Sequence, residues 1–309
     1  MAPQHYAVAA AAADSPVQER GSVALLRAGS EVDGVFACTR KDRLMTRTGS
    51  PYLALELRDR TGAVQARAFR DADALAGRFD RGDLVRVAGR VERFRDQLVV
   101  EIGDIERTDP GPGAELSAFL PTAYRDLDEL DGFLEHLAGQ VYDRPFRLLL
   151  DELLADGQLR TAWRQAPCSR AGHHAYMGGL LEHTVAVTTL AHELCSLHPR
   201  LNSDLLLTAA ITHDLGRTRE FTYGAEIGLT DEGRLLGHLV IGERTLSERS
   251  GMLDDERRLA LLHCVLCHHG PASAPQGRFH SPEALALYRC NALDAGVKSA
   301  FEQGLPGAP

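Results

Sequence analysis

Lysine is nearly absent from this 309-residue sequence, which has it only at Lys41 and Lys298 and otherwise uses arginine for its positive charge. Long apolar runs are also missing, so no segment predicts a membrane span. The alanine-rich start has no basic segment, and its apolar stretch ends at Asp14. We therefore expect a disordered tail over residues 1–30 rather than a secretory signal, and a cytoplasmic protein.

Cysteine is sparse and follows no disulfide framework. The six cysteines are scattered, and without an export signal their thiols are expected to be reduced. Cys264 to His268 matches the CxxCH spacing of haem attachment and contains the CxxC of a redox pair. Haem attachment belongs to exported proteins, and His268 has another use described below, so we favour neither interpretation.

Negative charge predominates, with a net charge of −9, but it is unevenly distributed. Residues 31–107 contain 15 Lys and Arg against 14 Asp and Glu, whereas the remaining residues contain 19 against 29. The first part is therefore neutral and rich in arginine, which is compatible with nucleic-acid binding. The second part is acidic and rich in histidine, which indicates a domain that binds cations.

Residues 31–107 alternate between apolar and polar side chains, with turns between the runs. The pattern predicts strands at 32–39, 52–59, 64–69, 84–91 and 98–105. It also predicts a polar loop at 41–50 and a short helix at 71–79, N-capped near Asp71. Five strands with a helix between the third and fourth is the order of an OB-fold barrel. We therefore predict an OB-fold nucleic-acid-binding domain over residues 31–108.

The same alternation predicts which side chains face outward from the barrel. Leu53, Leu55 and Leu57 are expected inside, so their neighbours along the second and third strands point out. The candidate nucleic-acid contacts are Tyr52, Arg58, Arg67 and Phe69, together with Phe94 in the loop between the last two strands. Aromatic rings among arginines suit base stacking and phosphate contact. The alternative is that the rings only cover the barrel.

Asp109 to Gly113 reads DPGPG, which predicts a linker, extended here over residues 109–125. Beyond it the periodicity becomes helical. Helices are predicted at 126–138, 145–155, 159–165, 180–197, 203–215, 238–251, 254–268 and 282–301. The expected architecture is therefore multidomain, with a β OB-fold barrel followed by an all-α domain over residues 126–303.

Ligand-type residues recur through the helical part in a fixed order: His183, His213 with Asp214, His238, His268 with His269, and Asp294. The intervals are 30, 25, 30 and 25 residues, each about one helix plus a connection. Successive helices can therefore bring these side chains to one centre. Imidazole favours transition metals, and Asp214 could bridge two ions. Two such ions can activate a water and hold a phosphoryl group.

The ordered set H…HD…GH…HH…D resembles the HD superfamily of metal-dependent phosphohydrolases. The flanking segments, among them 173–183, 205–217, 230–238 and 262–270, are similar to those of YhaM-type 3′→5′ exoribonucleases. That family joins an OB-fold to an HD domain. The resemblance covers most of the chain beyond residue 30.

The resemblance implies a ligand set for each of two divalent transition-metal ions, manganese first, with cobalt or iron as alternatives. His183, His213, Asp214 and Asp294 would surround one ion, and Asp214, His238, His268 and His269 the other. The family usually has lysine where this chain has Arg217, and commonly serine at the position of Cys267. Arg217 is expected to stabilise charge on the phosphoryl group beside Asp214. His173 and His174 are candidates for phosphate contact or for a structural role.

The resemblance implies 3′→5′ cleavage of single-stranded RNA, and of single-stranded DNA as a second substrate, to nucleoside 5′-monophosphates, with no membrane partner. One alternative is an HD phosphohydrolase of small nucleotides in which the OB-fold is regulatory. Another is a nucleic-acid-binding module without activity, whose metal only supports folding. The complete ligand set argues against the last, and the arginine-rich aromatic surface argues against the first. The oligomeric state is left open.

Overall fold

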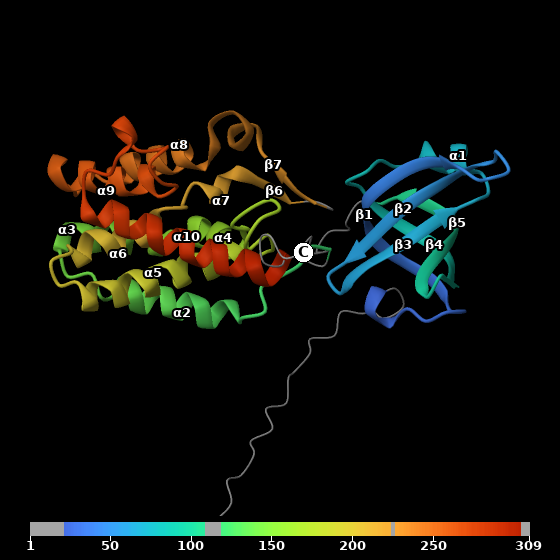
Figure 1. Cartoon of the computed structure of the whole chain (residues 1–309), viewed down its shortest axis with the longest axis horizontal. Helices are drawn as coiled ribbons and strands as arrows, with labels where there is room; N and C mark the ends of the chain where they lie inside the picture. The colour runs from blue at the N-terminus through green and yellow to red at the C-terminus, as the bar shows by residue number, and fades with distance from the viewer. Residues whose placement is uncertain (1–21, 109–118, 224–225, 304–309) are drawn as a thin grey trace, which may run out of the picture. The chain divides into compact units, whose positions relative to one another are not determined.

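The computed structural model describes residues 22–108, 119–223 and 226–303. The chain divides into two compact units, Met1–Gly113 and Ala114–Pro309 (Figure 1). None of the helices in the described ranges is long and apolar enough to cross a bilayer.

The first unit is a closed barrel with the strand order β1-β2-β3-β5-β4. Its elements are β1 (Glu31–Met45), β2 (Pro51–Asp59), β3 (Gly62–Ala68), α1 (Ala72–Ala76), β4 (Leu84–Phe94) and β5 (Gln97–Arg107). The parallel β3–β5 pairing and the antiparallel β1–β4 pairing close the sheet. Leu53, Leu55 and Leu57 are buried, as the alternation predicted. The OB-fold prediction, with its helix between the third and fourth strands, is confirmed.

Three local predictions in the barrel were wrong. The polar loop predicted from Lys41 is strand as far as Met45, because backbone pairing with β2 continues after a bulge at Cys38–Arg40 and needs no apolar side chains. The short helix starts after Asp71, as predicted, but it ends at Ala76 instead of Phe79, and the Asp71 side chain makes no cap bond. Phe94 ends β4 instead of lying in a loop, because Arg95 and Asp96 form a tight turn with positive φ angles of 47° and 64°.

The segment before β1 also differs from the predicted tail. Residues 1–21 lie outside the described residues, but a 3₁₀ turn (Val23–Leu25) precedes a buried Leu26. The Val23 amide donates to the Asp59 carboxylate at 2.8 Å. Residues 22–30 therefore pack on the barrel, because Leu26 adds to its apolar core.

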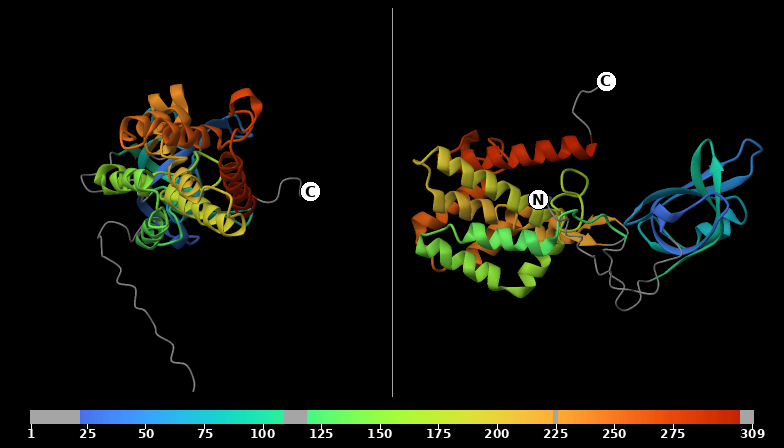
Figure 2. Two further views of the ribbon diagram at one scale, coloured as in Figure 1. Left: turned by 90° about the vertical axis from the view of Figure 1, so that its left-hand side faces the viewer. Right: turned by 90° about the horizontal axis from the view of Figure 1, so that it is seen from below.

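The second unit is helical (Figure 2). Its helices are α2 (Leu127–Ala138), α3 (Arg144–Ala155), α4 (Gly157–Gln165), α5 (Gly179–Leu197), α6 (Ser203–Thr212), α7 (Arg217–Glu220), α8 (Asp231–Arg249), α9 (Asp255–Cys267) and α10 (Pro282–Gln303). A hairpin of β6 (Phe221–Tyr223) and β7 (Ile227–Leu229) follows α7. Helix α5 packs against α2, α6 and α10, and a large apolar core that includes Leu150, Trp163 and Leu206 fills the space between the helices.

The helix starts follow the sequence closely, because polar side chains accept the free amides of the first turns. These N-caps are Asp126, Asp143, Asp156, Asn202, Thr230 and Asp254. Helix α8 begins at Asp231, earlier than the predicted start at residue 238. A break at Gly237 (φ 70°) separates its first residues from the rest, and only the part after the break was predicted. The first half of the predicted linker, 109–118, lies outside the described residues. Its last part packs on the helical unit, where Leu120 is buried against Phe221 and Ile227.

Candidate active site

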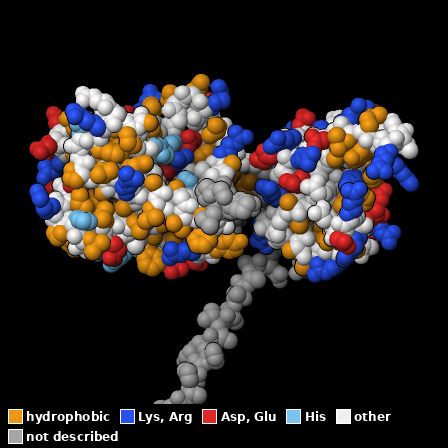
Figure 3. Space-filling model, in the orientation of Figure 1, with side chains coloured by type: hydrophobic (Ala, Val, Ile, Leu, Met, Phe, Trp, Pro, Cys, Tyr) orange, Lys and Arg blue, Asp and Glu red, His pale blue; other side chains and the backbone are white. Residues whose placement is uncertain are grey.

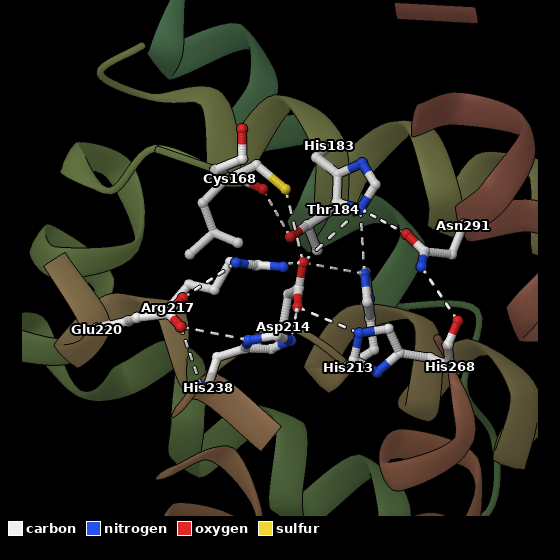
Figure 4. Close-up of polar contacts among 12 residues, drawn as sticks. Cys168, His183, Thr184, His213, Asp214, Arg217, Glu220, His238, His268 and Asn291 are labelled. Atoms are coloured by element: carbon white, nitrogen blue, oxygen red, sulfur yellow. Dashed lines mark hydrogen bonds and ion pairs between the residues drawn. The ribbon is translucent and has the colours of Figure 1, made fainter. Parts of the chain in front are cut away.

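The ends and breaks of helices carry most of the ligand-type side chains. His183 lies in the second turn of α5, His213 and Asp214 follow α6, His238 follows the break in α8, His268 and His269 follow α9, and Asp294 lies within α10. Figure 4 shows His183, His213, His238 and His268 around Asp214. The structure therefore brings the ordered set to one place.

Close backbone approach makes this convergence possible. A Cβ atom added at Gly216 would lie 2.0 Å from the carbonyl oxygen of His238. One added at Gly233 would lie 2.2 Å from the Glu220 oxygen, and one at Gly179 the same distance from the His174 oxygen. Each of these glycines therefore sets the position of a residue at the site.

Asp214 belongs to two groups of residues whose ligand atoms all lie within 4.8 Å of one another: Asp214, His238, His268 and His269 form one, and His183, His213 and Asp214 the other. Its Oδ1 atom is 3.3 Å from His268 Nε2 and 3.4 Å from His238 Nε2. Its Oδ2 atom is 3.6 Å from His213 Nε2 and 3.9 Å from His183 Nε2. Each carboxylate oxygen thus faces a different group, as a bridging ligand requires.

The donor set fits divalent metal ions. His213 Nδ1 is 2.8 Å from the Ala210 carbonyl oxygen and His268 Nδ1 is 2.6 Å from that of Val265. These bonds fix the proton on Nδ1 and leave each Nε2 lone pair facing Asp214, the arrangement of metal-binding histidines. Among the described residues, Asp214 Oδ1 and His268 Nε2 are buried without a hydrogen-bond partner. Unpaired buried polar atoms are costly, and a bound cation would satisfy both.

Burial disfavours the protonated form of two of these histidines, His213 and His269, and a metal-binding imidazole must be unprotonated. Burial lowers the pKa of His269 to about 3 and that of His213 well below its ordinary value, with neighbouring histidines adding to both shifts. Burial would raise the pKa of Asp214, but the nearby Arg217 guanidinium outweighs it and holds the carboxyl well below its usual range. Asp214 is therefore held as an anion within the buried site.

Asp294 lies outside the two groups of ligand atoms that contain Asp214, whereas the resemblance implied that it is a direct metal ligand there. Its Oδ2 atom is 2.6 Å from His183 Nδ1 and 3.0 Å from His174 Nε2, so it forms a separate group with these two residues. His183 turns its other nitrogen, Nε2, toward His213 Nε2 at 3.2 Å. Asp294 thus orients His183 from behind, and its predicted place as a direct ligand stays a prediction.

Arg217 is buried between two carboxylates (Figure 4). Its Nε atom forms an ion pair with Asp214 Oδ2 at 2.8 Å, and its Nη1 atom donates to Glu220 at 3.0 Å. Glu220 also accepts the backbone amide of His238 at 3.2 Å. Arg217 therefore neutralises Asp214 and links it to α8. Its predicted catalytic role stays a prediction.

His173 and His174 lie on a tight loop between α4 and α5. His174 adopts a left-handed backbone conformation (φ 50°), and its Nδ1 atom is 2.7 Å from the Tyr176 hydroxyl, which donates to Glu182 at 2.7 Å. His173 turns instead toward Cys168, whose Sγ atom lies 3.5 Å from His173 Nε2. The structure thus gives both histidines contacts within the protein.

Three residues at the site were not predicted from the sequence. Cys168 donates to Asp214 Oδ2 across 3.6 Å, Glu220 holds Arg217, and the Asn291 Oδ1 atom is 3.0 Å from His183 Nε2. Glu220 and Asn291 are each three residues from a singled-out position, Arg217 and Asp294, which on a helix places them on the same face. No spacing rule pointed to Cys168.

On the barrel, four of the five predicted contact residues form two pairs, one of stacked rings and one of a cation over a ring. The rings of Tyr52 and Phe69 stack with centroids 5.3 Å apart, and the Arg67 guanidinium lies 4.3 Å from the Phe94 ring centre. Phe69 is 47% exposed and Phe94 is 44% exposed. Arg58 is separate, 3.7 Å from Glu56 near the other end of β2. Figure 3 shows cationic and acidic side chains interspersed on the barrel.

Comparison with known proteins supports the same division of the chain. Residues 180–296 match the model of the HD domain, and residues 37–108 match that of an OB-fold nucleic acid binding domain. A 3′-5′ exoribonuclease YhaM from Shouchella clausii is 30% identical over 296 residues, which cover 91% of this chain and 89% of that protein. The chain belongs to the YhaM exoribonuclease family.

Further YhaM proteins match over similar lengths. The YhaM of Halalkalibacterium halodurans is 28% identical over 90% of this chain and 88% of its own length. The YhaM of Bacillus subtilis is 27% identical over 92% of both chains. The resemblance found in the sequence motifs is therefore confirmed across both units.

Proposed function

We propose that this chain is a metal-dependent 3′→5′ exoribonuclease that degrades single-stranded RNA to nucleoside 5′-monophosphates in the cytoplasm. The observation that carries the proposal is Asp214, which turns one oxygen toward each of two ligand groups in a chain of the YhaM family. We propose two ions per chain, with manganese as the first candidate and cobalt or iron as alternatives.

The chain's own residues prepare the site for phosphodiester hydrolysis. Two bound divalent ions would supply an activated water and neutralise charge on the phosphoryl group. His238, His268 and His269 would hold one, and His183 and His213 the other, with Asp214 shared and Asp294 fixing His183. Arg217 keeps the buried Asp214 ionised. We assign stabilisation of the phosphoryl charge to Arg217, and contact with the phosphate to His173 and His174.

The division of labour follows the two predicted domains. The barrel, residues 31–108, would hold the strand, and the helical domain, residues 126–303, would cleave its 3′ end. The Tyr52–Phe69 and Arg67–Phe94 pairs offer exposed rings and a cation on one barrel surface. Each stacked base contributes about 1–3 kcal/mol without regard to sequence, which suits an enzyme that degrades along a strand.

The decisive experiment uses 5′-labelled single-stranded RNA with the full chain and Mn²⁺. We expect a ladder that shortens from the 3′ end, and nucleoside 5′-monophosphates as the small product. The same strand in a duplex should resist, because a site between helices admits a single strand end. Single-stranded DNA in a parallel reaction tests the second substrate.

The control is Asp214→Asn, which keeps the side-chain shape and removes the bridging charge. It should form no ladder. If the unaltered protein leaves RNA intact with Mn²⁺, Co²⁺ and Fe²⁺ while converting free nucleotides, the exonuclease proposal is wrong and a small-nucleotide phosphohydrolase replaces it.

A further inference from the structure

Cys168 is fully buried at the edge of the candidate active site, and the proposed reaction does not use it. It begins the loop between α4 and α5, which is closed by two hydrogen bonds. The Cys168 amide donates to the His174 carbonyl at 3.0 Å, and the Ser169 hydroxyl donates to the His173 carbonyl at 2.8 Å. This tight loop brings the Cys168 thiol and the His173 ring together.

His183 completes a group of metal-ligand type. The ligand atoms of Cys168, His173 and His183 all lie within 4.8 Å of one another. Tetrahedral zinc, with Zn–S of about 2.3 Å and Zn–N of about 2.0–2.1 Å, separates sulfur and nitrogen by about 3.6 Å. The Cys168 Sγ to His173 Nε2 distance is 3.5 Å. The loop therefore already has the spacing of two ligands of such an ion.

The type of donor distinguishes this group from the groups around Asp214. Thiolate sulfur favours thiophilic ions such as Zn²⁺, whereas Mn²⁺ prefers oxygen and nitrogen ligands. A thiophilic ion would displace the thiol proton to solvent as the Cys168–metal bond forms. One cysteine and two histidines also leave a fourth position, and Asp214 Oδ2 lies 3.6 Å from the sulfur.

We propose that Cys168, His173 and His183 form an additional site for a thiophilic divalent cation, which overlaps the candidate metal centre at His183. His183 belongs to this group and to the group with His213 and Asp214. An ion at the thiol therefore withdraws His183 from the centre that would hold Mn²⁺. Zinc then inhibits an enzyme that manganese activates, a consequence that rests on the proposed function, whereas binding itself does not.

Binding is tested with Co²⁺, whose thiolate complexes give a charge-transfer absorption band in the near ultraviolet. The full chain is stripped with a chelator and titrated with Co²⁺. We expect the band in the unaltered protein and its loss in Cys168→Ser. Cys267→Ser is the matched control, because Cys267 is equally buried beside another candidate ligand but faces His263 at 3.4 Å. That variant should keep the band.

A second variant, His173→Ala, keeps the thiol and removes a nitrogen ligand. It should raise the Co²⁺ concentration at half-maximal absorbance at least roughly 10-fold, since losing even an outer partner of a metal ligand costs that much. A missing band in the unaltered protein overturns the site whatever the variants do. A band that survives in Cys168→Ser, or is lost in Cys267→Ser, assigns the thiolate elsewhere and overturns it equally.

Activity gives a separate result. Zn²⁺ added to the Mn²⁺-supplied protein should inhibit RNA cleavage, and Cys168→Ser should need at least roughly 10-fold more Zn²⁺ for the same fractional inhibition. Equal Zn²⁺ sensitivity in both proteins overturns the inhibitory consequence. If the unaltered protein cleaves no RNA at all, the proposed function fails, while the Co²⁺ titration still decides whether the thiol site exists.

Discussion

Replacing Arg217 with methionine tests whether the guanidinium is the internal counter-charge of Asp214. The side chains of Arg217 and Asp214 are 10% and 2% exposed, and Arg217 Nε lies 2.8 Å from Asp214 Oδ2, so water screens their interaction little. Removing one member of a buried ion pair typically costs about 3–5 kcal/mol. Protonation of Asp214 limits the loss, because neutralising an aspartate of ordinary pKa at pH 7 costs about 4 kcal/mol. We expect Arg217→Met to lose about 3–4 kcal/mol of unfolding free energy in metal-free protein.

The pH dependence has a definite sign. In the unaltered protein the folded-state pKa of Asp214 is depressed, so its contribution to stability is present above the unfolded pKa and is constant between pH 7 and pH 5. Without Arg217, burial raises that pKa, and the folded variant takes up a proton. The difference in unfolding free energy between the unaltered protein and Arg217→Met should therefore shrink as the pH falls from 7 to 5, by up to about 1.4 kcal/mol for each pH unit. Saturating Mn²⁺ should also reduce it, because bound cations replace the lost charge.

Urea unfolding followed by the fluorescence of Trp163 measures this deficit in the helical unit, because Trp163 is the sole tryptophan and is buried in that core. Arg219→Met is the matched control on the same short helix. Arg219 Nη2 lies 2.9 Å from Glu232 Oε2, but the two side chains are 55% and 28% exposed. Arg219→Met should therefore lower the unfolding free energy by less than about 1 kcal/mol. A deficit for Arg217→Met that changes neither with pH nor with Mn²⁺ would refute the counter-charge role.

Three further substitutions test the bridging carboxylate, the aromatic surface of the barrel and the close backbone contact at Gly216. Asp214→Ala should lose both proposed ions, measured by elemental analysis of protein purified without chelator, and a variant that keeps both would contradict the bridging role. Phe69→Ala should weaken binding of a single-stranded oligonucleotide by about 1–3 kcal/mol in a fluorescence titration, with chromogenic phosphodiester cleavage unchanged. Equal losses on both substrates would show that the ring only supports the fold. Gly216→Ala should reduce metal affinity at least roughly 10-fold by calorimetry although it removes no ligand, since it displaces His238; unchanged affinity would show that α8 adjusts freely.

Much of the fold followed from local patterns. Strands β2 and β3 alternate strictly between buried and outward side chains. Six helices begin at side chains that cap them. These elements could therefore be predicted from single segments of the sequence. The order of the ligand residues was also informative, although its intervals are not single helices. The rest of α5 and all of α6 lie between His183 and His213, and the rest of α8 and all of α9 lie between His238 and His268. The hairpin of β6 and β7 was missed because three-residue strands are too short to show a period.

The contacts between segments far apart in the sequence could not be predicted from local patterns. The carboxylate of Asp294 contacts His183 Nδ1 and His174 Nε2, and these contacts depend on how α10 packs against α5. Cys168 lies beside Asp214 although 46 residues separate them. The extension of β1 to Met45 likewise depends on its partner strand and not on its own side chains.

The glycines at 179, 216 and 233 show that part of this site is specified by residues that bind nothing. Gly216 also faces the Gly242 amide, 2.6 Å from where its own Cβ would lie, so two helical segments meet there backbone to backbone. A related chain could keep every histidine and aspartate of the ordered set and yet have alanine at position 216. A search for the ligand pattern would accept that chain as an enzyme, although a Cβ atom at position 216 would require the backbone at His238 to move. Judging whether a distant relative is still active therefore requires these three small positions to be inspected along with the metal ligands.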